Sequence, residues 1–352
     1  MIGGLLGLLG AGVALCGCSN HAGLAPPAAP LSQPTQLCME NTAPPTCRSA
    51  SQVEQLLAGD VRILSMDDTP GGSQGAKLLT LRGTLQGQSV TFRAKWRPQS
   101  SAGLINEPRK ELAAYAVQKL FLDDDQLVVP PTVARCFPLA DYRRFMADEQ
   151  PTFAGVDCVL GFASYWLEGV KTVEAARDDG WLPSGDGILD KKLFESDPLY
   201  AASLARANLL TYAINHGDAH GKQFLLERTP RGLRTYIADN SIALRSIKNP
   251  MLLVREDWSQ IQVPRLDRKA LARLRALTDR DLSELATVEL LELQRGQLLP
   301  TQQPEAPVGG TNEMSWAGKY LRIGLTKGER ELVASRIHEL LARSDLEQPN
   351  AP

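Results

Sequence analysis

Three strand-like segments joined by short turns lie within residues 61–96, and they constrain the fold of this chain more than any other feature. The segments cover residues 61–66, 76–82 and 89–96. Apolar runs bounded by Gly, Pro and Asp predict strands, and this close spacing predicts an antiparallel meander. In the third segment, the side chains of one face are Val90, Phe92, Ala94 and Trp96, and those of the other are Thr91, Arg93 and Lys95. The alternation predicts one buried face and one cationic face.

A helix is expected after the meander, over residues 107–121. Asn106 is expected to cap this helix and Pro108 to lie in its first turn, where the absent N–H of proline costs nothing. The helix places Glu111 near its start. One acidic side chain therefore follows the cationic strand face at a short distance along the chain.

The second half of the sequence is expected to be mainly helical. Residues 197–213 predict an amphipathic helix that leads directly into the stretch NHGDAHGKQF, residues 215–224. A hairpin is expected over residues 224–239, and residues 255–346 are expected to be mostly helical. Asp218 then lies before the hairpin and Asp239 at its far end.

The composition is that of an ordinary globular protein. A chain of 352 residues with 43% hydrophobic residues can bury a core of two lobes. Its 38 Lys and Arg are balanced by 40 Asp and Glu, so no net basic field points to nucleic acid. We expect two lobes, over residues 51–165 and 166–352, after an N-terminal signal over 1–18 and a Pro-rich tether over 19–50.

The N-terminal eighteen residues, MIGGLLGLLGAGVALCGC, carry no charged side chain and form an apolar run too short for a comfortable membrane span. A removable export signal explains this pattern. The run ends in Leu15-Cys16-Gly17-Cys18, which resembles the bacterial lipobox, so Cys18 is expected to carry the lipid anchor. The implied location is the bacterial cell envelope, periplasmic or at the outer membrane, with the protein attached to the membrane through this lipid.

Four further cysteines are consistent with export. The simplest pairing is Cys38 with Cys47 and Cys136 with Cys158, because an even number of cysteines in an exported chain favours disulfides. Free buried thiols remain the alternative if the chain is cytosolic.

Transfer of a phosphoryl group from ATP requires a cation on the phosphates, an acid that holds this cation, a carboxylate that orients the attacking hydroxyl, and metal ligands. The chain supplies such residues in the order found in kinases: a turn containing Gly71, Gly72, Ser73, Gln74 and Gly75, then Lys95, Glu111, Asp218, Gln223 and Asp239. Each residue alone has an ordinary structural explanation. Their order indicates a phosphotransferase.

Three stretches, GGSQGAKLLTLRGTLQGQSVTFRAKWRP, EPRKELAAYAVQKLF and VVPPTVAR, resemble the N-lobe of the secretory-pathway kinases of the four-jointed and Golgi casein kinase family. The later GDAHGKQF and IADNSIAL resemble its Asp-x-His catalytic loop and its Asp-Asn metal motif. The loop also resembles that of HipA-type serine kinases and the Asp-x-His of phosphatidylinositol kinases. The resemblance covers about residues 60–245. It implies an α+β, two-lobed protein-kinase-like fold, with a small β-rich N-lobe containing one key helix and a larger helical C-lobe.

The same resemblance implies roles for particular side chains. Lys95 would contact the phosphates of ATP, and Glu111 would hold Lys95 or a metal ion. Asp218 would orient an acceptor hydroxyl of a protein or glycan, and His220 would brace the loop.

The resemblance also implies which residues would bind the metal ion and the nucleotide. Asp239 would bind Mg²⁺ or Mn²⁺, with Gln223 as its partner. Residues 71–75 would cover the phosphates with backbone amides, and residues 160–166 would meet the adenine.

Departures from the family pattern leave alternatives open. Gln223 stands where many kinases have a metal-binding Asn, and Arg93 shares a strand face with Lys95, so a nucleotide-binding pseudokinase with a scaffolding role is one alternative. A metallohydrolase that uses His216, Asp218 and His220 is another. A third is a non-catalytic lipoprotein that binds an envelope component.

Overall fold

The structure is a computed structural model, and it describes residues 36–37, 47–70, 75–103, 106–183, 187–245, 256–301 and 314–343. Several predicted features lie outside these residues and stay predictions: the lipid anchor at Cys18, the partner Cys38 of Cys47, and the turn residues Gly71, Gly72, Ser73 and Gln74.

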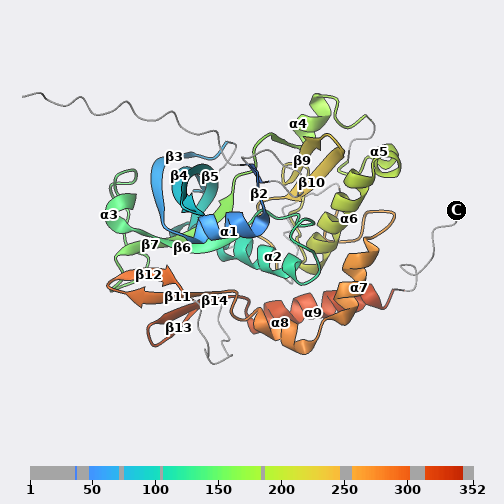
Figure 1. The fold of residues 1–352 in the computed structure, drawn as a ribbon. Coiled ribbons are helices and arrows are strands. Elements are labelled where there is room, and N and C mark those ends of the chain that lie inside the picture. Colours follow the sequence, from blue (N-terminus) through green and yellow to red (C-terminus); the bar gives the residue numbers. More distant parts are fainter. Residues whose placement is uncertain are drawn as a thin grey trace, which may run out of the picture. The chain divides into compact units, whose positions relative to one another are not determined.

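An antiparallel sheet of five strands forms the first half of the fold (Figure 1). Its strands are β3 (Val61–Asp68), β4 (Lys77–Leu85), β5 (Gln88–Pro98), β6 (Thr132–Pro138) and β7 (Cys158–Tyr165), in the spatial order β3-β4-β5-β7-β6. The predicted meander is confirmed as β3, β4 and β5. The turn from β4 to β5 is the pair Gln86-Gly87, with φ of 50° and 78°. Two positive φ values in a two-residue turn match the twist of adjacent strands.

The two faces of β5 differ as the alternation predicts. Phe92, Ala94 and Trp96 are fully buried, and Lys95 is partly exposed on the opposite face. Trp96 packs edge-on against Phe137 with ring centroids 4.8 Å apart. The strand is thereby anchored in the core, which fixes the positions of the cations on its opposite face.

Two helices accompany this sheet. The first, α1 (Ala50–Ala58), begins with a capping box between Ser49 and Gln52. The second, α2 (Arg109–Lys119), carries Glu111 in its first turn, as expected. Its start differs from the prediction, because Pro108 occupies the cap position and no side chain caps the helix. A proline that fixes φ can begin a helix without a side-chain cap.

Helix α6 (Pro198–Ala213) leads into the 215–224 stretch, as the sequence predicts. Asp197 caps it by accepting hydrogen bonds from Leu199 N at 2.9 Å and Tyr200 N at 3.0 Å. The expected amphipathic character is wrong, because α6 buries side chains on nearly every side. Such a helix lies inside the protein. The predicted hairpin follows as β9 (Phe224–Thr229) and β10 (Gly232–Ile237).

The C-terminal region is not mostly helical, contrary to the expectation. It contains a four-stranded antiparallel sheet in the order β12-β11-β14-β13. The strands are β11 (Glu289–Gln294), β12 (Gln297–Pro300), β13 (Met314–Ala317) and β14 (Tyr320–Ile323). The turn from β11 to β12 is Arg295-Gly296, with φ of 50° and 82°. This short turn was the local signal for a hairpin.

The remaining elements are short, apart from the last helix. They are β1 (Gln36–Leu37), β2 (Cys47–Arg48), the 3₁₀ turn Gln99–Ser101, α3 (Leu139–Tyr142), β8 (Val170–Thr172), α4 (Val173–Asp178), α5 (Lys191–Ser196), α7 (Arg268–Ala276), α8 (Asp279–Glu284) and α9 (Lys327–Leu341). Among the residues described, none of the helices combines the length and the apolar composition that crossing a membrane requires.

The order of these elements confirms the expected fold class. A β-rich N-terminal lobe with α1 and α2 beside its sheet is followed by a part built around α6 (Figure 1). The segment from β7 to β8 connects the two along the chain. This is the α+β, two-lobed, kinase-like arrangement. The predicted disulfide between Cys136 and Cys158 is also present and joins β6 to β7.

Candidate functional site

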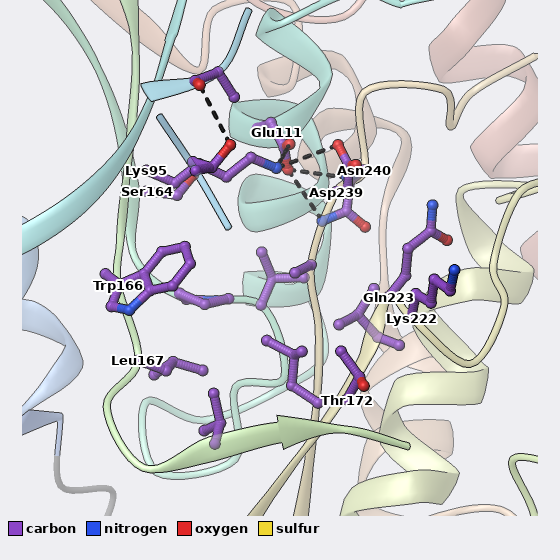
Figure 2. A pocket seen from close by; sticks show the side chains of 18 of the residues that line it. Lys95, Glu111, Ser164, Trp166, Leu167, Thr172, Lys222, Gln223, Asp239 and Asn240 are labelled. Atoms are coloured by element: carbon purple, nitrogen blue, oxygen red, sulfur yellow. Dashed lines mark hydrogen bonds and ion pairs between the residues drawn. The ribbon is translucent and has the colours of Figure 1, made fainter. Parts of the chain in front are cut away.

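A cavity of about 830 Å³ lies between the cationic face of the N-terminal sheet and the loops that follow α6. It brings together six predicted site residues from distant parts of the chain: Lys95, Glu111, Asp218, His220, Gln223 and Asp239. In Figure 2, Lys95, Glu111, Asp239 and Asn240 form one group, while Lys222 and Gln223 lie on another wall. The fold thus places the strand, the helix and both loops around one space.

Lys95 links the helix to the Asp239 loop. Its Nζ donates to Glu111 Oε1 at 2.9 Å and to Asp239 Oδ1 at 3.2 Å. Glu111 is 3% exposed, and its other carboxylate oxygen accepts a hydrogen bond from the backbone N–H of Asn240 at 3.0 Å. Both oxygens of Glu111 therefore have defined partners. The predicted ion pair between strand Lys and helix Glu is present, and it also holds the Asp239 loop.

Arg97 is a site residue that the sequence interpretation missed. It lies two positions after Lys95 on the same strand face and is 2% exposed. Its Nη1 donates to Asp239 Oδ1 at 2.6 Å and to Ser241 Oγ at 2.8 Å. Extending the period-two alternation of the strand by one more position would have found it. The site thus contains two cations beside Asp239.

The charges of this group stabilise one another. Burial of the ammonium alone would lower the pKa of Lys95, but the Glu111 and Asp239 carboxylates outweigh burial and raise it above its usual value. Burial alone would raise the pKa of Asp239, but Lys95 and Arg97 outweigh burial and hold it well below its usual range. Lys95 is therefore protonated and Asp239 ionised at neutral pH.

The backbone of Asp239 is in the left-handed region, with φ of 61°. Asp tolerates this region better than most residues, and its cost is of order 1–3 kcal/mol. The conformation is fixed by neighbours on both sides, since Ala238 N donates to Gln223 O at 2.9 Å and Asn240 N donates to Glu111. Strain held by surrounding contacts is typical of functional loops.

Asp218 and Gln223 interact directly within the loop after α6. Gln223 Nε2 donates to Asp218 Oδ2 at 2.9 Å, and Gln223 Oε1 accepts from the backbone N–H of His220 at 3.3 Å. Asp218 is only 7% exposed. The Gln223 amide therefore orients the Asp218 carboxylate, and metal ligation by Gln223 stays a prediction.

The two histidines of the loop differ in position. His216 is fully buried, and this burial lowers its pKa against the attraction of Asp218, Asp239 and Glu111. His220 lines the cavity, and its Nδ1 accepts a hydrogen bond from Lys222 N at 3.3 Å. His220 thus contacts the loop backbone, and its bracing role stays a prediction.

The segment between the lobes closes another side of the cavity. Ser164, Trp166 and Leu167 line it (Figure 2). Trp166 N donates to Arg93 O at 3.0 Å. Arg93 does not compete for the Lys95 position. Its Nε donates to Glu168 Oε1 at 2.6 Å, and this bond raises the pKa of Arg93.

A divalent ion would find one suitable carboxylate here. In the described part of the chain, no group of three or more His, Cys, Asp or Glu side chains is arranged to hold a metal ion. His216, Asp218 and His220 are all described, and they do not form such a group. Mg²⁺ in phosphotransferases uses one or two carboxylates, water and the substrate phosphates. Asp239, with a side chain 48% exposed, fits that mode.

Comparisons with known proteins identify no family. No family model matches the chain, and no curated protein matches it. Among solved structures, it is similar to a crystal structure of the Golgi casein kinase, with 11% sequence identity and a TM-score of 0.44, over 84% of this chain and 76% of that chain. A likeness this distant carries no argument about activity, so the functional assignment depends on the geometry of the cavity.

Proposed function

We propose that this protein is an ATP-dependent phosphotransferase that acts on a hydroxyl acceptor in a protein or glycan. One observation carries the proposal: the Lys95–Glu111–Asp239 network lines the same cavity as Asp218. A structural module has no need for a lysine held by a buried helix carboxylate beside two loop aspartates.

The charges suit binding of a triphosphate. Lys95 and Arg97 provide positive charge for the phosphate oxygens, and Glu111 keeps Lys95 in place. Asp239 would hold Mg²⁺ or Mn²⁺, which, when bound, neutralises charge that develops on the phosphates. Trp166 and Leu167 offer an apolar wall for the base. ATP fits these features because it combines a flat base with a chain of anions.

The transfer step assigns the proton to Asp218. The acceptor oxygen forms a bond to the γ-phosphorus, the bond from that phosphorus to the bridging oxygen breaks, and ADP leaves. Asp218 accepts the hydroxyl proton, and Gln223 keeps the carboxylate oriented at 2.9 Å. Such catalysis consists largely of positioning and electrostatics.

The experiment compares wild type with Asp218→Asn. Asp148→Asn is the matched control, because Asp148 is exposed and does not line the cavity. ATP binding is measured by calorimetry, and γ-phosphate transfer or ATP turnover is followed with Mg²⁺ and with Mn²⁺. We expect Asp218→Asn to lose turnover by at least about 100-fold with ATP affinity within a few-fold of wild type. Unchanged turnover in this variant would show that Asp218 is not the catalytic carboxylate.

A pseudokinase is the second candidate, because Arg97 and Lys95 both contact Asp239 Oδ1, the oxygen that a metal ion would need. A pseudokinase of this kind would bind ATP equally well in EDTA and in Mg²⁺, and would not turn it over. A phosphotransferase would show turnover that depends on the metal ion. ATP binding and ATP turnover, each measured with Mg²⁺ and with EDTA, therefore separate the two candidates.

We also propose that the protein is anchored in the bacterial cell envelope through a lipid on Cys18. The Cys136–Cys158 disulfide supports export, because disulfides persist in oxidising compartments. Metabolic labelling with a fatty acid tests the anchor. Label lost in Cys18→Ser supports it, and label retained in this variant contradicts it.

A further inference from the structure

The C-terminal region packs against helix α2, which carries Glu111. One cluster of buried side chains joins the two sheets and this helix: Leu112 of α2, Ala134, Cys136, Leu160 and Phe162 of the N-terminal sheet, and Leu291, Leu298, Leu321 and Ile323 of the C-terminal sheet. The last strand of this sheet, β14, is followed closely by α9. The C-terminal residues are therefore part of the environment of α2.

A buried ion pair joins the first turn of α2 to the first turn of α9. Arg109 Nη2 donates to Glu329 Oε1 at 2.7 Å, and Arg109 Nη1 donates to Glu329 Oε2 at 2.9 Å. Arg109 is 4% exposed and Glu329 is 8% exposed. Two parallel contacts between a guanidinium and a carboxylate fix orientation as well as distance.

Two further charged side chains, Lys110 and Glu107, lie beside this ion pair. Lys110 is 2% exposed, and its Nζ lies 3.0 Å from Glu107 Oε1 and 3.9 Å from Glu329 Oε1. Glu107 also accepts from Arg109 Nη2 at 2.7 Å. Arg109 and Lys110 thus lie against both carboxylates, and Arg245 Nη2 also lies 3.8 Å from Glu107 Oε1. Buried ion pairs of this kind contribute little net stability, and their best-attested role is to fix register.

Helix α9 also contacts the element that leads to Asp218. Arg336 on α9 donates from Nε to the backbone oxygen of Tyr212 at 2.6 Å, near the end of α6. Figure 1 shows α9 running along the C-terminal part, beside α7 and α8. One helix therefore contacts α2, which carries Glu111, and α6, which precedes the Asp218 loop.

We infer that α9 is a built-in positioning element, and that the Arg109–Glu329 pair sets the position of α2 so that Glu111 meets Lys95. Arg109 lies two residues before Glu111 in the same first turn, so a rotation or shift of this turn moves the Glu111 carboxylate. Arg109 and Glu329 are positioning residues, because they do not line the cavity. This inference rests on the proposed function, since it concerns the same Lys95–Glu111 pair.

Glu329→Gln tests the inference with little change in shape. Glu329 also completes the capping box of α9, in which Thr326 N donates to its Oε2 at 2.9 Å. Glutamine serves equally well at this capping position. The substitution thus removes the charge that faces Arg109 and retains the cap. Glu331→Gln is the matched control, because Glu331 lies on the same helix with a side chain 65% exposed.

The measurements use the full chain, in the wild-type background and in a Glu111→Gln background. ATP affinity is measured with Mg²⁺, the melting temperature is recorded, and hydrogen exchange is followed in α2. In the wild-type background, we expect Glu329→Gln to weaken ATP binding about tenfold and to speed exchange in α2, whereas Glu331→Gln changes neither. In the Glu111→Gln background, Glu329→Gln should change ATP affinity by less than about twofold. In both backgrounds it should lower the melting temperature, because Arg109 loses its buried partner charge.

The possible outcomes separate this inference from the proposed function. The positioning role alone would be overturned if Glu329→Gln weakened ATP binding equally in both backgrounds. It would also be overturned if Glu329→Gln lowered the melting temperature but left ATP affinity and hydrogen exchange in α2 unchanged. A wild-type protein that binds no ATP would overturn the proposed function, and the inference with it. If Glu329→Gln does not fold, Arg109→Lys is measured in its place, because it keeps the charge and loses the two-contact geometry. The same pattern of results is expected for it, and the same results overturn the inference.

Discussion

Glu289 is a carboxyl group whose protonation should control the stability of the contact between the two sheets. It is the first residue of β11, and its Oε2 accepts a hydrogen bond from the backbone N–H of Ala134 at 3.0 Å on the edge strand β6. Burial raises the pKa of Glu289 from its usual 4.5 to about 7, with a further increase from Glu54 and opposing effects from the Ala134 N–H, Arg135 and Lys119.

The sign of the pH dependence follows from this raised pKa. The folded protein holds the proton of Glu289 more tightly than the unfolded chain does. The resulting stabilisation is fully present below pH 4.5 and is lost as the pH rises through about 7. A difference of about 2.5 pH units, at 1.36 kcal/mol per unit, gives an upper limit of roughly 3 kcal/mol. Part of this is screened by water, because Glu289 is only partly buried.

The test is urea denaturation of wild type and Glu289→Gln at pH 5, 6, 7 and 8. Glutamine keeps an acceptor for the Ala134 N–H and has no proton to lose. We expect the two proteins to have similar stability at pH 5, and the variant to be more stable at pH 8 by 1 kcal/mol or more, within the limit of roughly 3 kcal/mol. Glu284→Gln, with a side chain 57% exposed, is the control and should follow wild type. The same pH slope in wild type and in Glu289→Gln would refute this reasoning.

Three further predictions concern the site and the disulfide. Arg97→Ala should weaken ATP binding by at least about tenfold, because Asp239 and the phosphates lose a buried cation, whereas Arg97→Lys should retain most of the affinity. Calorimetry measures the affinity, and equal ATP affinities of wild type and Arg97→Ala would show that Arg97 does not contribute to the site. Gln223→Glu should lower the free energy of unfolding by roughly 1–3 kcal/mol, since a second carboxylate replaces the donor 2.9 Å from Asp218. An unchanged melting temperature would contradict the prediction that this hydrogen bond contributes to stability. Replacing Cys136 and Cys158 by Ala should cost roughly 3 kcal/mol in urea denaturation, from a sequence separation of 22 residues, and a midpoint equal to that of the oxidised wild type would show that the disulfide contributes nothing.

Local sequence patterns were sufficient for the elements that carry the site. The alternation in the third strand places Lys95 opposite the buried Trp96, and the last helix begins at a capping box from Thr326 to Glu329, a pattern visible in the sequence. Strand alternation and helix capping are set by neighbours within about four residues. Such features can be read from a single sequence.

Local patterns failed where long-range contacts decide. The stretch 289–300 was expected to be helical, yet it forms β11 and β12, and its one local hairpin signal is the Arg295-Gly296 turn. Leu291 and Leu298 of this stretch are buried in one cluster with residues of the N-terminal sheet, and burial by a distant partner outweighs weak local propensity. Helix α6 was expected to have a polar face, and the elements packed around it leave it nearly none.

The candidate site residues Lys95, Glu111, Asp218 and Asp239, and their order along the chain, can be read from the sequence alone. Their partners are set by the folded structure. It paired Arg97 with Asp239 and turned the Gln223 amide toward Asp218. A charge in a buried site must find a partner, and for Arg97 that partner is 142 positions away. A partner so distant in the sequence is selected by the packing of whole elements, and local sequence does not encode it.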